Sequence, residues 1–189
     1  MMRRLGWASW AGILLVTMAL APGAEAASHQ WRFNELFSNA DGTVQFIEMK
    51  ECCGFTAEHE LGGKWILAVG AENQFDFRGD LTGDTSNRHL LLATQGFADL
   101  PGAPTPDIII PDGFLPVESE TLEYWLYNQA TFSYDSLPTD GVTSLNADHT
   151  TGLNSPTNYA GDSGSVTPVE SVRWGSIKVM PFPRLPRRW

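Results

Sequence analysis

Glu35 and Glu48 are the first candidates for chemistry in this sequence, because they fall on opposite sides of a predicted hairpin turn. Residues 31–50, WRFNELFSNADGTVQFIEMK, read as two apolar strands around Asp41-Gly42, and an Asp-Gly step between hydrophobic runs favours a tight turn. A two-residue turn pairs positions whose numbers sum to 83, so Glu35 faces Glu48. Facing carboxylates repel, which predicts a raised pKa, a bound cation or hydrogen bonds from backbone amides. A longer turn, or a bulge that rotates Glu48 outward, is the simpler alternative.

A second candidate chemistry is acyl transfer by a serine. Residues 161–165, Gly-Asp-Ser-Gly-Ser, resemble the nucleophile motif of chymotrypsin-like serine proteases, and residues 56–60 faintly match their histidine motif. A hydrolase would use Ser163 as nucleophile and His59 as base, oriented by an acid. However, Ser165 stands where that motif has a further glycine, and no apolar strand brackets the serine. The sequence favours a non-catalytic protein and keeps a serine hydrolase as the alternative.

Calcium is the one cofactor that the sequence suggests. Asp80, Asp84 and Asn87 fall in one turn-rich segment and, like Glu35 and Glu48, offer the oxygen ligands that calcium prefers. None of them matches a known calcium-loop signature, and Asp and Asn are ordinary turn residues. The four histidines have no metal-ligand spacing. We therefore expect no cofactor, with a calcium-dependent adhesin as an alternative.

The two cysteines of the chain, Cys52 and Cys53, are adjacent. An even number of cysteines in an oxidising compartment normally indicates a disulfide. Neighbouring cysteines can bridge only through a strained eight-membered ring, so the sequence predicts two free or capped thiols, one of them buried. A vicinal disulfide that acts as a redox switch is the alternative.

The first 26 residues read as a signal-peptide helix rather than as part of the fold. Arg3 and Arg4 form a basic start, residues 7–21 are an apolar run too short for a comfortable membrane span, and residues 24–26 fit a small-x-small cleavage site. We expect a mature chain that starts at Ala27 and is secreted or periplasmic, with no later membrane span. An uncleaved membrane anchor is the alternative.

Charge is distributed unevenly along the chain. Residues 27–172 carry 21 acidic and five basic side chains, which would repel nucleic acid and anionic lipid. Five of the basic residues fall in the last 17 positions, so residues 169–189 form a basic tail. This tail either folds back onto the acidic body, binds a separate anion, or is a frayed terminus.

The composition favours an all-β domain over residues 27–168. Eighteen glycines, 12 prolines and 11% aromatic residues suit a chain of short strands and many turns. Residues 135–168 are rich in Ser, Thr, Asn, Asp, Gly and Pro and predict long ordered loops. Turn signals recur about every ten residues, as in a sandwich or barrel. Besides the hairpin, strands are predicted at residues 64–69, 74–78, 89–94, 108–110, 121–127, 130–134 and 169–179.

The order of these strands resembles the lamin-tail domain. Residues 33–49, FNELFSNADGTVQFIEM, resemble its opening, and residues 61–67, LGGKWIL, are similar to its Leu-x-Gly-x-aromatic-x-Leu strand. Residues 120–124 are similar to a later strand, and residues 154–158 to the Pro-containing close. The Pro-Gly-Gly turn that usually precedes the fourth strand is replaced here by residues 82–88.

The resemblance implies an immunoglobulin-like β-sandwich and no single activity. In that family the equivalents of Glu35 and Glu48 recur without known catalysis, and secreted bacterial members are accessory, adhesive or interaction modules. We therefore expect a secreted, non-catalytic module for binding, adhesion or structural interaction, whose ligand is an unknown protein or glycan.

Overall fold

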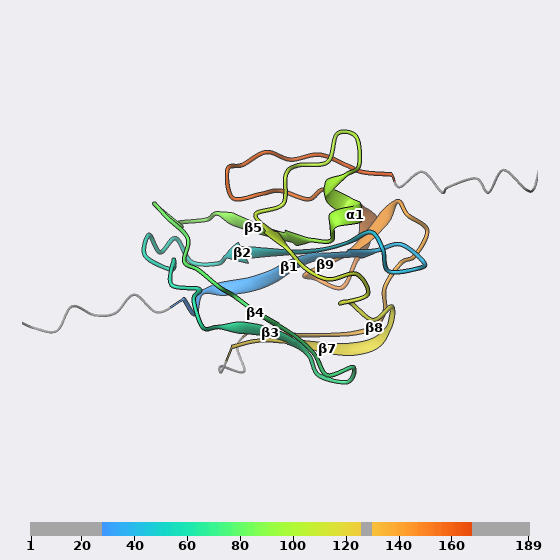
Figure 1. Cartoon of the computed structure of the whole chain (residues 1–189), viewed down its shortest axis with the longest axis horizontal. Coiled ribbons are helices and arrows are strands. Elements are labelled where there is room, and N and C mark those ends of the chain that lie inside the picture. The colour runs from blue at the N-terminus through green and yellow to red at the C-terminus, as the bar shows by residue number, and fades with distance from the viewer. Residues whose placement is uncertain (1–27, 126–129, 168–189) are drawn as a thin grey trace, which may run out of the picture.

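The chain forms two β-sheets and a covering layer of loops in the computed structural model, which describes residues 28–125 and 130–167 (Figure 1). The six-stranded sheet has the order β10-β9-β1-β2-β5-β6, and the four-stranded sheet has the order β4-β3-β7-β8. The expectation of an all-β sandwich is confirmed. The elements are β1 Trp31–Ser38, β2 Gln45–Glu51, β3 Trp65–Ala68, β4 Asn73–Asp76, β5 His89–Ala93, α1 Gln95–Ala98, β6 Ile108–Ile109, β7 Glu118–Tyr124, β8 Thr131–Ser136, β9 Thr143–Asn146 and β10 Thr151–Leu153.

The inner core lies between the two sheets and is built from alternate residues of their strands. Trp31, Ile66 and Leu122 are fully buried there, and Phe77 packs edge-on against Tyr124 at 6.0 Å between ring centroids. Alternation places polar residues of β7 and β8 on the opposite face, as expected for strands that bury one side. Within the described residues, no helix is long and apolar enough to cross a membrane.

The hairpin register predicted from the sequence is confirmed. Glu35 pairs with Glu48 and Phe37 with Phe46, whose rings stack at 5.3 Å. The turn is longer than two residues, because strand pairing stops at Ser38 and residues 39–44 form the connection. The predicted register still continues into the turn, because the Asn39 amide donates to the carbonyl of Val44, and these two positions also sum to 83.

A bulge at Asn34 changes which side chains of β1 point to the inner core and which point to the outer face of the sheet. The pairing with β2 shifts between Phe33 and Glu35, so that one extra residue is accommodated on β1. Phe33 faces the inner core before the bulge, and Leu36 faces it afterwards. Glu35 is thereby moved to the outer face, where Glu48 also lies.

The prediction of loops throughout residues 135–168 is wrong in part, because β9 and β10 lie within this segment. β9 pairs with β1 and buries Leu145, and β10 pairs with β9. Their sequences, Thr-Ser-Leu-Asn and Thr-Gly-Leu, hold a single large apolar residue each, so periodicity alone gave no signal. The strand expected at residues 169–179 lies outside the described residues.

A third layer covers the outer face of the six-stranded sheet. Residues 154–166, which we call the strap, run over this face together with α1 (Figure 1). Thr94 caps α1 by accepting a hydrogen bond from the Phe97 amide. The apolar part of this layer, which we call the outer cluster, consists of Phe37, Val44, Phe46, Leu91, Ala93, Phe97 and Val166.

Candidate functional site

The paired glutamates lie beneath the strap and are almost completely buried. Glu35 is 2% exposed and Glu48 1%. The Ser144 hydroxyl and the Ser155 amide donate to Glu35 Oε1 at 2.5 and 2.8 Å. Burial raises the pKa of Glu35, and the neighbouring Glu48 charge raises it further, against the lowering effect of these hydrogen bonds.

Glu48 is equally surrounded by donors. Asn34 Nδ2 donates to Glu48 Oε1 at 2.5 Å, and His89 Nδ1 lies 2.8 Å from the same oxygen. The Thr157 amide donates to Glu48 Oε2 at 2.6 Å. Two of the three outcomes predicted for facing carboxylates are therefore present: the pKa of Glu35 is raised, and both carboxylates accept hydrogen bonds from backbone amides.

These contacts belong to a regular arrangement along the strap. The amides of Ser155, Thr157 and Tyr159 donate to the carboxylates of Glu35, Glu48 and Asp107, respectively. Alternate amides of an extended segment point to the same side, so carboxylates here take the place of a neighbouring strand. The glutamate pair is thus engaged in holding the strap on the sheet.

Ser163 and His59 are not brought together. Ser163 is exposed in the strap, where it forms a β-bridge with Thr157. His59 lies in the loop between β2 and β3, and its carbonyl accepts the amides of Leu61 and Leu81. No hydrogen bond joins Ser163 to His59 among the described residues, and the serine hydrolase stays an alternative prediction.

The carboxylates of the candidate calcium ligands Asp80 and Asp84 accept backbone amides, Asp80 from a distant loop and Asp84 within its own turn. Asp80 Oδ1 accepts the Gly62 amide at 2.7 Å, and Asp84 Oδ1 accepts the Ser86 amide at 2.8 Å. Within the described residues, the one group of three or more His, Cys, Asp or Glu side chains close enough to hold a metal ion is formed by Glu51, Cys52 and Cys53. Neither Asp80 nor Asp84 belongs to it.

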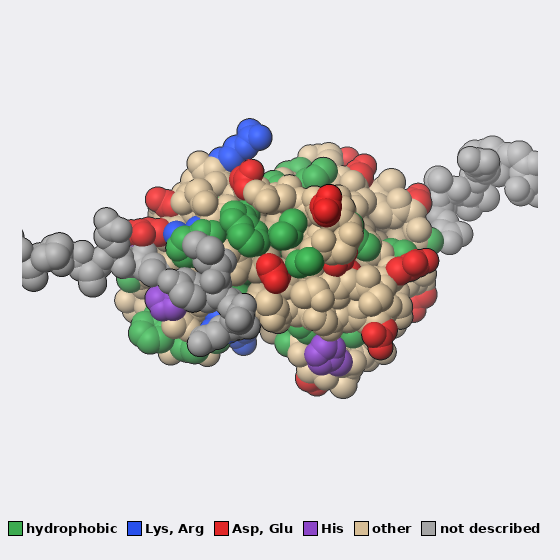
Figure 2. Space-filling view, turned by 90° about the horizontal axis from the view of Figure 1, so that it is seen from below, with side chains coloured by type: hydrophobic (Ala, Val, Ile, Leu, Met, Phe, Trp, Pro, Cys, Tyr) green, Lys and Arg blue, Asp and Glu red, His purple; other side chains and the backbone are tan. Residues whose placement is uncertain are grey.

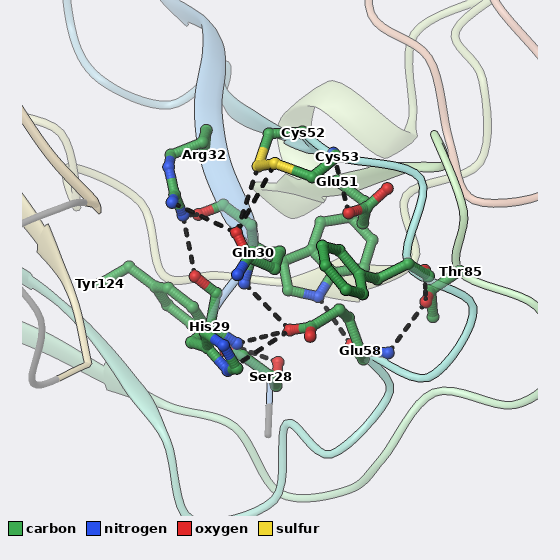
Figure 3. A network of polar contacts seen from close by, with 12 residues as sticks. Ser28, His29, Gln30, Arg32, Glu51, Cys52, Cys53, Glu58, Thr85 and Tyr124 are labelled. Carbon is green, nitrogen blue, oxygen red and sulfur yellow. Dashed lines mark hydrogen bonds and ion pairs between the residues drawn. A yellow bond between two sulfur atoms is a disulfide. The ribbon is translucent and has the colours of Figure 1, made fainter. Parts of the chain in front are cut away.

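The expectation of free thiols is wrong, because Cys52 and Cys53 form a disulfide and both are exposed. The buried carboxylate of Glu51 holds the following backbone by accepting the amides of Cys53 and Gly54 at 2.9 and 2.8 Å. Figure 3 shows both sulfurs facing the side chain of Gln30, whose Oε1 lies 3.4 Å from Cys52 Sγ and 3.6 Å from Cys53 Sγ. Neither thiol is buried, because both cysteines lie beyond the end of β2, in the exposed stretch of residues 52–57.

A groove between the edges of the two sheets is the site that sequence reasoning missed. It has a volume of about 780 Å³ and runs between β4 and β6, the last strands of their sheets. The apolar lining includes Phe75 and Ile109, the latter 47% exposed. Asp76, Arg78, Asp80 and Asp107 supply its charges. The strand predicted at residues 74–78 falls on one side of the groove, but the sequence predicted no groove and did not place residues 107–111 beside this strand.

Comparisons with protein-family models, with curated proteins and with solved structures found no match to this chain. The resemblance to the lamin-tail domain therefore stays a prediction.

Proposed function

We propose that this protein is a secreted, non-catalytic binding module, and that its ligand is an extended polypeptide segment bound in the groove between β4 and β6. The observation that carries the proposal is the groove itself. Its volume of about 780 Å³ is within the range of ligand sites, roughly 300–1,000 Å³. Its lining combines apolar and charged side chains, which is the usual composition of such sites.

The position of the groove favours an extended peptide. β4 and β6 each have a strand partner on one side only, so a ligand strand can add to either edge. Three aspartates and one arginine line the groove, and the acidic excess favours a ligand with basic as well as apolar side chains. Glycan binding is less well supported, because the lining includes no tryptophan or tyrosine face for a sugar to stack on.

The compartment is supported by two independent features. The basic, apolar and small-residue segments of residues 1–26 have the order of a signal peptide. The exposed disulfide of Cys52 and Cys53 fits an oxidising environment, since cytosolic thiols are kept reduced. We further infer that the sandwich is of the immunoglobulin-like, lamin-tail type, on the order of the motif pieces along residues 33–158.

The test is a peptide and glycan array probed with the purified protein, followed by calorimetry on the strongest hits. We expect binding to peptides that combine apolar and basic residues, and affinity that falls with added salt. Ile109→Asp should weaken this binding at least about tenfold, because it places a charge on the apolar wall.

Val69→Asp is the matched control, since Val69 is 41% exposed and does not line the groove. Equal loss of binding in both variants would contradict the assignment of the groove. Hits confined to glycans would contradict the peptide ligand.

A further inference from the structure

The surface around Cys52 and Cys53 brings two sulfurs and one carbonyl oxygen together at a single exposed point. Gln30 Oε1 lies 3.4 and 3.6 Å from the two sulfur atoms, and Figure 3 shows both sulfurs directed toward it. The chain has no other cysteines that could compete for oxidation or for a ligand.

The backbone on both sides of this point is held without help from the S–S bond. Gln30 is fixed by its amide, which donates to Glu58 Oε2 at 2.9 Å, and by its carbonyl, which accepts the Cys52 amide at 3.0 Å. Glu51 accepts the amides of Cys53 and Gly54. Breaking the disulfide therefore leaves in place the backbone that carries both thiols and Gln30.

Glu51 also anchors a second loop, because its Oε2 accepts the Asn87 amide at 2.8 Å. One carboxylate oxygen of Glu51 and both sulfurs all lie within 4.8 Å of one another. A carboxylate so close to two thiols favours the approach of a cation.

We propose that the reduced form of this surface binds a thiophilic divalent cation of the zinc or cadmium class, with Cys52 Sγ, Cys53 Sγ and Gln30 Oε1 as ligands. Two thiolates select soft and borderline cations over calcium or magnesium. Disulfide formation occupies both sulfurs and closes the site, so the redox state of the surroundings gates metal binding.

The chemistry requires a dithiol reductant from outside the protein. Its two thiols transfer two electrons and two protons, the S–S bond of Cys52 and Cys53 breaks, two S–H bonds form, and the reductant becomes a disulfide. The cation then displaces one proton from each thiol. Arg32 must give up a long contact of 3.5 Å to Gln30 Oε1, and it retains closer hydrogen bonds to the carbonyls of His29 and Trp31.

The test is titration of the purified protein with Cd²⁺, in its oxidised form and after anaerobic reduction and removal of the reductant. The reduced protein should bind one equivalent, with a thiolate-to-metal charge-transfer band and the release of up to two protons, and the oxidised protein should show neither. Zn²⁺ should displace the bound Cd²⁺ or compete with it. A reduced protein without the band, or an oxidised protein with it, would overturn the proposal.

Gln30→Ala separates the oxygen ligand from the thiols. We expect at least about a tenfold loss of Cd²⁺ affinity, as for removal of supporting groups at metal sites. Gln74→Ala is the matched control, because Gln74 is an exposed glutamine whose side chain contacts Asp76. Equal affinity of Gln30→Ala and wild type would overturn the assignment of Gln30.

Thermal melting of the reduced protein with and without Cd²⁺ distinguishes a loss of metal binding from a loss of folding. A ligand that binds only the folded state raises the melting temperature, so the reduced wild type should gain stability with Cd²⁺. A Cys52→Ser, Cys53→Ser double variant should melt cooperatively without any gain. A gain equal to that of the reduced wild type would contradict the role of the sulfurs.

Discussion

The outer faces of the two sheets differ sharply in what covers them. On the six-stranded sheet, β1, β2 and β5 are buried on both sides, because α1 and the strap lie over them (Figure 1). On the four-stranded sheet, β8 alternates between buried and exposed residues. Figure 2, which views the molecule from below, shows apolar, acidic and other polar side chains mixed at the surface.

The difference teaches how an acidic chain can use its carboxylates. Under the strap, buried glutamates accept backbone amides that have no strand partner, so they serve as acceptors for a loop. On the other sheet, the buried Glu120 accepts the loop amides of Gly70 and Ala71 in the same way, whereas Glu123 lies half-buried on the outer face and accepts no backbone amide among the described residues. A pair of facing glutamates therefore indicates a covering segment here, and its catalytic or metal-binding interpretation gains no support.

The largest effect should follow from opening the outer cluster. Phe46 is fully buried, stacked on Phe37 and edge-on to Phe97 at 5.4 Å. Phe46→Ala should cost about 3–5 kcal/mol of the free energy of unfolding, measured in urea. Ser133→Ala on the exposed face of β8 should stay within about 0.5 kcal/mol. Similar costs for both variants would show that the strap layer contributes no real core.

Removal of one buried carboxylate should have the next largest effect. Glu48→Ala leaves Asn34 Nδ2, the Thr157 amide and His89 without their acceptor, and should cost about 2–3 kcal/mol in the same unfolding experiment. Glu123→Ala is the control and should change stability by no more than about 0.5 kcal/mol. A Glu48 variant as stable as the control would mean that the strap does not need this anchor.

A smaller effect should follow from shortening one side chain of the strap. Ser155 Oγ donates to Glu35 Oε2 at 3.1 Å, and Ser155→Ala should cost about 0.5–1.5 kcal/mol. Ser163 lies in the same strap and is exposed, so Ser163→Ala should change the free energy of unfolding by no more than about 0.5 kcal/mol. The opposite order of the two costs would contradict the position of the strap on Glu35.

The smallest effect should be the change with pH in the stability that two buried glutamates contribute, one from each sheet. Burial raises the pKa of Glu35. At Glu120, burial acts in the same direction, but the amides of Gly70, Thr121 and Ala71 outweigh it and lower the pKa. The stabilising contribution of Glu35 is therefore full below the ordinary glutamate pKa and is lost as the pH rises through its raised value. That of Glu120 is present above the ordinary value and is lost as the pH falls through its lowered value.

Glu35→Gln and Glu120→Gln test these signs directly. The stability deficit of Glu35→Gln relative to wild type should be larger at about pH 4 than at about pH 7, and that of Glu120→Gln should be larger at about pH 7. Urea unfolding at both pH values measures the four differences. Deficits that change in the same direction would contradict one of the two shifts.

Much of the hairpin could be predicted from residues close in the sequence. Asp41-Gly42 and the flanking alternation were sufficient for the register, and therefore for the contact between Glu35 and Glu48. The Asn34 bulge gave no such signal, although it decides which face Glu35 addresses. The prediction of free thiols was wrong. It rested on ring strain alone, because the sequence does not reveal the contacts that hold the backbone of Cys53 and Gly54 on Glu51.

By itself, the sequence determined the all-β class, most strand positions and the facing glutamates, since these depend on alternation and turn residues within one segment. Tertiary structure alone decided that the glutamates are covered and that β4 and β6 border a groove. The physical reason is separation along the chain: Ser155 meets Glu35 across 120 positions, and no local pattern records which distant amide will satisfy a buried carboxylate.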